Sequence, residues 1–90
     1  MLEKQFKITS ETGLHARVSS QLVREASSFT SKITLTVGDA TVDFKSIMGV
    51  MSLGVYKGEI IKVVCDGADE EEAMSHITFL ILDLKLGRDY

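Results

Sequence analysis

With 90 residues, the chain is long enough for one domain with a single core, and its 44% of hydrophobic residues is ordinary for a globular protein. Its net charge of −3 argues against nucleic acid and against anionic membrane as main partners. One cysteine cannot form an internal disulfide. The first five residues lack a hydrophobic signal region, and the longest apolar run (residues 79–82) is too short to cross a bilayer. We therefore expect a cytoplasmic protein without membrane insertion.

Seven elements are predicted from apolar residues that recur at every second position in strands and at every third or fourth position in helices. In chain order they are a strand at 5–9, a helix at 16–29, hairpin strands at 32–37 and 42–44, a short helix at 46–52, a strand at 60–66 and a helix from 70 to about 86. The order β-α-β-β-α-β-α predicts an α+β domain over residues 1–90. We expect an open four-stranded antiparallel sheet with helices covering one face.

The loop before the first helix holds a histidine at the position where that helix is expected to begin. If the helix begins at Ala16, His15 lies just outside its N-terminus, where the first backbone N–H groups have no intrahelical acceptor. An anion carried by His15 would meet those amides, with the Arg17 guanidinium as a second partner. The motif is suited to a phosphoryl group on histidine, and a solvated loop histidine is the plainer alternative.

The short helix begins at Ser46, whose hydroxyl can cap it by accepting a backbone N–H. A phosphate on Ser46 would also be favoured there, because the N-terminus of a helix attracts negative charge. The apolar residues Ile47, Met48, Val50 and Met51 offer more surface than a helix of under two turns can bury. We expect Ile47 or Val50 in the core, with Met51 as a further core candidate, and adaptable methionine surface available to partners.

The last helix is predicted to begin with a capping box formed by Asp69 and Glu72, and to stop at Gly87. One of its faces is the ordinary apolar face that covers a sheet. Phe79, Leu82 and Leu86 fall on nearly the opposite face at helical spacing. This outer stripe predicts a partner, with two-fold pairing of two copies as the simplest arrangement, and scattered exposed residues are the alternative.

Two further reactive side chains do not predict a site. His76 lies off the apolar face of the last helix without metal-ligand spacing to another residue, so we expect it to be solvated. Cys65 alternates inward in its strand, and a thiol in apolar surroundings is inert. The sequence implies neither a metal ion nor an organic cofactor.

Two segments, residues 13–17 (GLHAR) and 45–54 (KSIMGVMSLG), resemble the signature regions of the HPr family. These are the histidine-containing phosphocarrier proteins of the bacterial sugar phosphotransferase system. The resemblance covers nearly the whole chain, and HPr proteins have the strand and helix order given above. One departure is Val18, which stands where the family pattern has proline.

The resemblance implies that His15 accepts a phosphoryl group from a first enzyme charged by phosphoenolpyruvate and passes it to sugar-specific transporter components. Arg17 would neutralise the group in transfer, and the chain itself would not be an enzyme. The resemblance also implies ATP-dependent regulatory phosphorylation of Ser46 by HPr kinase/phosphorylase. The residues expected to meet these partners are Ser20, Gln21, Arg24, Ile47, Met48 and Met51.

Two other functions stay open at this point. One is a regulatory paralogue that acts mainly through Ser46 phosphorylation, as a catabolite-repression cofactor of a catabolite-control transcription factor. Val18 favours this role slightly, whereas the presence of His15 opposes it. The other is an unrelated small binding domain of the same α+β class, for which the sequence offers no ligand motif.

Overall fold

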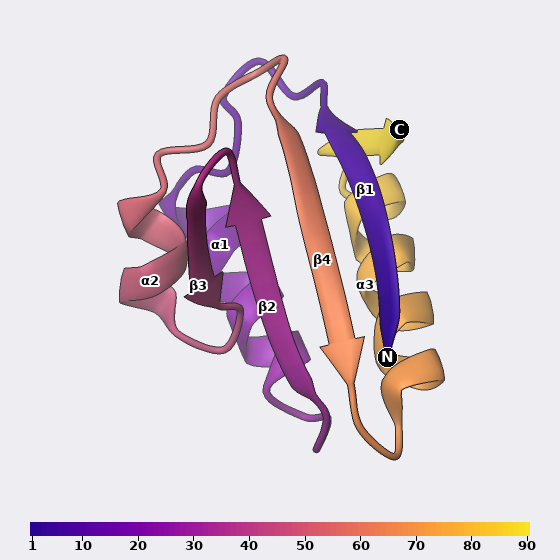
Figure 1. The fold of residues 1–90 in the computed structure, drawn as a ribbon. Coiled ribbons are helices and arrows are strands. Elements are labelled where there is room, and N and C mark those ends of the chain that lie inside the picture. The colour runs from indigo at the N-terminus through magenta and orange to yellow at the C-terminus, as the bar shows by residue number, and fades with distance from the viewer.

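A computed structural model describes all 90 residues as one antiparallel sheet with helices on one of its faces (Figure 1). The strands are β1 (Leu2–Ile8), β2 (Lys32–Val37), β3 (Ala40–Asp43), β4 (Ile60–Asp66) and β5 (Gly87–Asp89). The helices are α1 (Ala16–Ala26), α2 (Ile47–Ser52) and α3 (Glu70–Asp83). The sheet order is β3-β2-β4-β1-β5, and each neighbouring pair is antiparallel. The predicted α+β open-faced sandwich is therefore confirmed.

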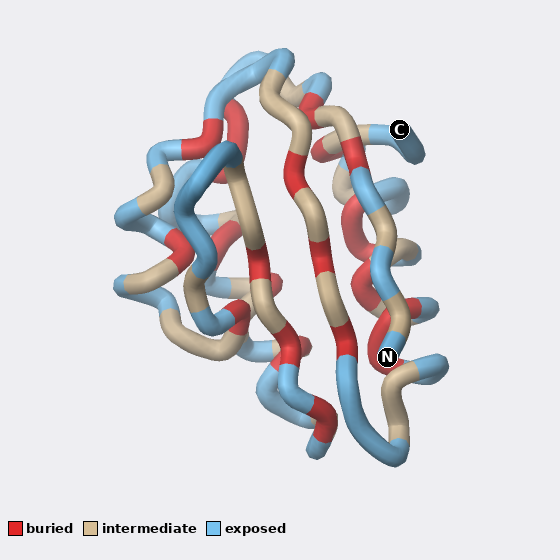
Figure 2. The backbone as a smooth tube through the Cα atoms, in the orientation of Figure 1, coloured by how far each residue is buried: buried red, intermediate tan, exposed pale blue.

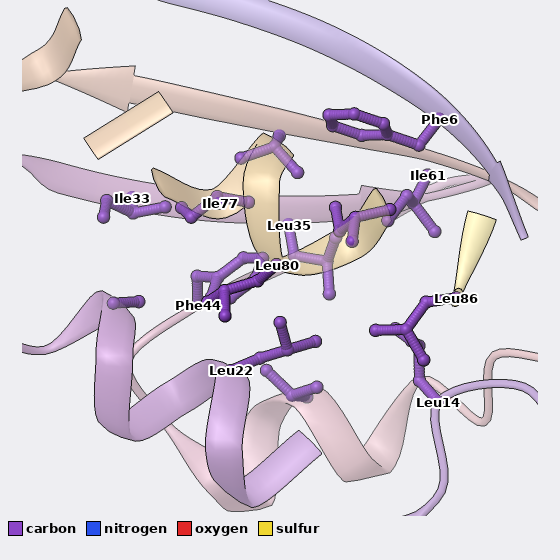
Figure 3. Packing of buried hydrophobic residues seen from close by; sticks show 14 of the residues in the cluster. Phe6, Leu14, Leu22, Ile33, Leu35, Phe44, Ile61, Ile77, Leu80 and Leu86 are labelled. Carbon is purple, nitrogen blue, oxygen red and sulfur yellow. The ribbon is translucent and has the colours of Figure 1, made fainter. Parts of the chain in front are cut away.

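The core lies between the sheet and the helices, because every second residue of the central strands points toward the helical layer. Figure 2 shows this alternation of buried and less buried positions along β2 and β4. The helices supply the opposite side of the core, where Leu22, Ile77 and Leu80 belong to the same buried cluster as Phe44 (Figure 3). Cys65, as predicted, is one of the buried positions of β4.

The short strand β5 is a fifth strand where the sequence predicted only four. It pairs with the free edge of β1, so that Gly87 lies opposite Ile8. The prediction that Gly87 ends the last helix is wrong, because this residue is part of β5. A Cβ added to Gly87 would come 2.4 Å from the carbonyl oxygen of Lys7, so only glycine allows β5 to approach β1 this closely. The segment has neither alternating apolar residues nor β-branched residues, so its own sequence does not favour a strand. It is a strand because it pairs with β1.

Two predicted helices are too long at their C-terminal ends. Helix α1 ends at Ala26 instead of Phe29, and α3 ends at Asp83 instead of near Leu86. After α3, Lys85 adopts a positive φ of 57° and the Leu86 N–H donates to the Ile81 carbonyl at 2.9 Å, which is the Schellman arrangement for ending a helix.

This turn carries Leu86 into the core, where it is 2% exposed. The prediction that Leu86 belongs to an outer stripe with Phe79 and Leu82 is therefore wrong. The other two residues do lie on the outer face of α3, with exposed fractions of 57% for Phe79 and 47% for Leu82.

The predicted capping box at the start of α3 is also wrong. The Asp69 side chain does not cap the helix; its carboxylate accepts hydrogen bonds from the Ser31 hydroxyl and from the backbone N–H groups of Thr30 and Ser31, both at 2.9 Å. These bonds lower the pKa of Asp69 to about 2. Asp69 thus ties the segment before β2 to the start of α3.

Candidate functional site

His15 immediately precedes α1, as predicted, and its side chain is exposed. Gly13 has a φ of +61° and approaches Val55 so closely that an added Cβ would lie 2.2 Å from the Val55 carbonyl oxygen. The buried Leu14 donates its N–H to that same oxygen at 3.1 Å, and its own carbonyl accepts the Ser19 hydroxyl at 3.0 Å. His15 is therefore held on a loop that is anchored on both sides by buried contacts.

The first turn of α1 offers backbone donors beside His15. The N–H groups of Ala16, Arg17 and Val18 have no hydrogen-bond acceptor, and the Ser19 N–H, which donates to the His15 carbonyl at 2.9 Å, is the first to have one. Free amides at the positive end of a helix attract anions, and the exposed Arg17 adds a formal positive charge two residues from His15. This arrangement can hold a phosphoryl group attached to the imidazole.

Ser46 caps α2, as predicted, because its hydroxyl accepts the Gly49 N–H at 3.1 Å. The side chain is half-buried. Its neighbour Lys45 donates Nζ to the Phe29 carbonyl, just beyond α1, at 2.6 Å. The Ser46 hydroxyl therefore lies at a helix N-terminus, and the residue before it in the chain carries a positive charge.

His15 and Ser46 lie at opposite ends of a pair of adjacent helices. The hydrogen bond between Leu14 and Val55 joins the start of α1 to the segment after α2, and the bond between Lys45 and Phe29 joins the opposite ends. Helices α1 and α2 therefore run antiparallel, as Figure 1 also shows. Since the 11 residues of α1 span about 16 Å, the two sites do not form one centre.

The predicted partner residues lie on these two helices and form what we call the α1–α2 face: Ser20, Gln21, Arg24, Ile47, Met48 and Met51. All are exposed except Gln21, which is half-buried. Met48 is the most open of them, at 81% exposure. Of the apolar cluster on α2, Val50 fills the core at 2% exposure, which confirms the expected division between core and surface. Met51, the further core candidate, lies on the surface at 40% exposure.

His76 is half-buried and paired, whereas the sequence predicted a solvated side chain. Its Nε2 lies 2.6 Å from Oε1 of Glu25 on α1, and its ring packs beside the rings of Phe29 and Phe79. The pairing joins residues 51 positions apart, so no local sequence pattern predicts it. Burial raises the pKa of the other reactive group, the Cys65 thiol, to about 11, which makes it a poor nucleophile at neutral pH.

The structure contains no group of three or more His, Cys, Asp or Glu side chains that could hold a metal ion. None of its helices has the length and apolar character needed to cross a membrane.

Comparison with known proteins gives one consistent family. Residues 2–83 match the family model described as the PTS HPr component phosphorylation site. The chain is 46% identical over 81 residues to the phosphocarrier protein HPr of Neisseria meningitidis, covering 90% of this chain and 91% of that relative.

Solved structures resemble the fold over nearly its full length. A histidine-containing phosphocarrier protein of Mycoplasma aligns with a TM-score of 0.93 at 36% identity, covering 96% of this chain and 98% of the other. The catabolite repression protein Crh of Bacillus subtilis, described as a swapped dimer, aligns with a TM-score of 0.72 at 35% identity, covering 92% and 95% of the two chains.

Proposed function

The chain belongs to the HPr family of phosphocarrier proteins of the phosphotransferase system, and from this membership we propose that His15 is the residue that carries the phosphoryl group. The observation that carries the proposal is an exposed imidazole directly before three backbone amides without acceptors. A carrier must release its group as readily as it accepts it. A shallow, exposed site serves both steps better than a closed pocket does.

In the proposed reaction, the phosphorylated first enzyme, charged from phosphoenolpyruvate, presents its phosphoryl group to His15. The lone pair of an unprotonated ring nitrogen, Nδ1 in the family, attacks phosphorus; the new N–P bond forms as the bond to the donor breaks. The free amides at the start of α1 would receive the phosphoryl oxygens, and Arg17 would offset their charge. The same exchange then passes the group to a sugar-specific transporter component, with the partner proteins supplying most of the positioning.

Mass spectrometry after incubation with phosphoenolpyruvate and the first enzyme tests this proposal. We expect the gain of one acid-labile phosphate in the wild type and none in His15→Ala, whose fold should persist because the side chain is exposed and makes no hydrogen bond. His76→Gln is the matched control and should be labelled like the wild type. Acid-labile labelling of His15→Ala to the wild-type extent would exclude His15 as the acceptor.

A regulatory role of Ser46 is the second candidate, supported by its hydroxyl at the start of α2 and by the similarity to Crh. A kinase of the HPr kinase/phosphorylase type would transfer the γ-phosphoryl group of ATP to the Ser46 oxygen, releasing ADP and the hydroxyl proton. The phosphorylated chain would then bind a catabolite-control transcription factor through the α1–α2 face.

An acid-stable phosphate that requires ATP and the kinase, and that disappears in Ser46→Ala, is the result expected for this regulatory role. Ser52→Ala is a suitable control, because Ser52 is an exposed serine at the other end of α2. If the kinase leaves the wild type unmodified, Ser46 has no such role in this protein.

A further inference from the structure

A shallow groove of about 540 Å³ lies between the segment after α1 and the first half of α3. The side chains that line it are Phe29, Glu71, Glu72, Ser75, His76 and Phe79. Phe29 lies at the end of α1 opposite to His15. The groove is therefore separate from the phosphoryl site.

Three rings form a continuous surface in this groove, which we call the aromatic row: Phe29, His76 and Phe79. The ring centroids of Phe29 and His76 are 5.7 Å apart, and those of His76 and Phe79 are 6.4 Å apart. The hydrogen bond to Glu25 fixes the middle ring. Because the His76 ring is held in place before any partner arrives, binding to this ring costs little side-chain entropy.

The apolar part of this surface is large for an outer helix face. Phe79 is 57% exposed, and Leu82, one turn further along α3, is 47% exposed. The residues on the opposite side of the helix, such as Ile77 and Ile81, are buried in the core. Nothing within the chain therefore covers Phe79 and Leu82.

The charged residues of the groove are both acidic. Glu71 and Glu72 are exposed and take part in no ion pair. Their place in the first turn of α3 suits the helix dipole, which explains why carboxylates occur in that turn but not why aromatic rings lie next to them. Carboxylates beside aromatic faces are the combination that receives a guanidinium, which stacks on a ring and pairs with carboxylate oxygens.

We propose that this groove is a docking site for a protein partner that presents an arginine flanked by apolar side chains. The guanidinium would lie against the aromatic row and pair with Glu71 or Glu72, while the apolar neighbours cover Phe79 and Leu82. A second copy of the chain fits less well, because its net charge of −3 has the same sign as the carboxylates of the groove. The site lies away from His15, so a partner held there leaves the phosphoryl site accessible.

The test uses two synthetic peptides, acetyl-Gly-Ser-Leu-Arg-Leu-Gly-Ser-amide and the same peptide with glutamine for arginine, titrated into the intact protein and followed by NMR. We expect the arginine peptide to shift the resonances of Phe29, His76 and Phe79 saturably, at least fivefold more tightly than the glutamine peptide. Added salt should weaken its binding.

Two protein variants and one control variant complete the test. We expect arginine-peptide binding to weaken at least fivefold in the double variant Glu71→Gln/Glu72→Gln, and also in the single variant Phe79→Ser. The control is Tyr90→Ser, which removes another exposed ring and should leave the binding unchanged. The proposal is overturned if the arginine peptide causes no saturable shift in the groove, or if the two peptides bind equally. A third outcome also overturns it. In that outcome, sedimentation shows that the wild type is a dimer and that Phe79→Ser is a monomer, and the arginine peptide does not bind.

Discussion

Val18 is the third residue of α1, where its backbone N–H has no acceptor and its half-buried side chain packs against the core. Proline at this position sacrifices no hydrogen bond and stiffens the unfolded chain. We expect Val18→Pro to add about 0.4–1 kcal/mol to the free energy of unfolding, and to raise the melting temperature by roughly 2–8 °C.

Calorimetry of the two proteins, together with their phosphoenolpyruvate-dependent labelling rates, checks this prediction. The rates should be similar, because two of the three free amides remain. A lower melting temperature for Val18→Pro would show that the valine side chain contributes more through packing than proline contributes through the unfolded chain.

We expect the hydrogen bonds of Asp69 to make part of the protein's stability depend on pH in the acid range. Its pKa is about 2 in the folded protein, below the ordinary value of 3.8, because Ser31 and Thr30 donate to its carboxylate. A lowered pKa means that this stabilisation is complete above about pH 4 and is lost as the pH falls from about 4 to about 2. Asp69→Asn should therefore lower the melting temperature clearly at pH 7 and much less at pH 2.5.

Asp39→Asn serves as the control for this pH dependence. Asp39 is exposed in the turn between β2 and β3, and its side chain makes no hydrogen bond. Its replacement should leave the melting temperature nearly unchanged at both pH values. A constant difference between Asp69→Asn and the wild type across this pH range would contradict the role assigned to the carboxylate.

The two histidines show how far single residues could be interpreted from the sequence. His15 was predictable because its setting is local: a glycine turn before it and a helix start after it. The setting of His76 is made by Glu25 and Phe29, which lie far away in the chain. Asp69 was misassigned for the same reason, since a capping box is a local pattern and its actual donors precede β2.

Among the secondary structure elements, the end of α3 separates two leucines that the sequence had placed on one stripe. Leu86 is 2% exposed beyond the turn at Lys85, whereas Leu82 is 47% exposed on the helix. Leu86→Ala should cost about 2–5 kcal/mol of the free energy of unfolding, because it leaves a cavity in the core. Leu82→Ala should change that free energy by less than about 0.5 kcal/mol.

Urea denaturation of the two variants measures both free energies of unfolding under the same conditions. Equal losses for Leu82→Ala and Leu86→Ala would mean that the two leucines share one environment. That result would be incompatible with a helix that ends at Asp83.

The long elements were predictable because their periodicity agrees with their burial. In β4, for example, Ile61, Val63 and Cys65 are the residues that alternate in the sequence and also the residues that are buried. The ends of elements were less predictable. Phe29 continues the spacing of α1 although the helix has already ended, and β5 depends on β1 for its hydrogen bonds.

At the scale of the whole molecule, the antiparallel arrangement of α1 and α2 determines how Ser46 can influence His15. The two residues lie at opposite ends of the helix pair, so a charge on Ser46 would act mainly through a partner that contacts both ends. We expect Ser46→Asp to slow the labelling of His15 by the first enzyme, because the added charge would repel an acidic docking surface.

Labelling rates measured over a range of salt concentrations test this coupling, and the difference between Ser46→Asp and the wild type should shrink as salt is added. Ser52→Asp is a useful comparison, since it places the same charge at the opposite end of α2. Equal rates for Ser46→Asp and the wild type at every salt concentration would show that the two sites are independent.

The position of β1 within the sheet has a consequence for the newly made chain. β1 leaves the ribosome first, yet its neighbour β4 begins at Ile60, about 50 residues after β1 ends at Ile8, and β5 comes later still. At about 5–20 residues per second, Phe6 and Ile8 wait roughly 3–10 s for β4 to be synthesised. The central strands therefore assemble only after β4 has been synthesised, and the chain that still lacks β4 is the form that most needs protection by chaperones.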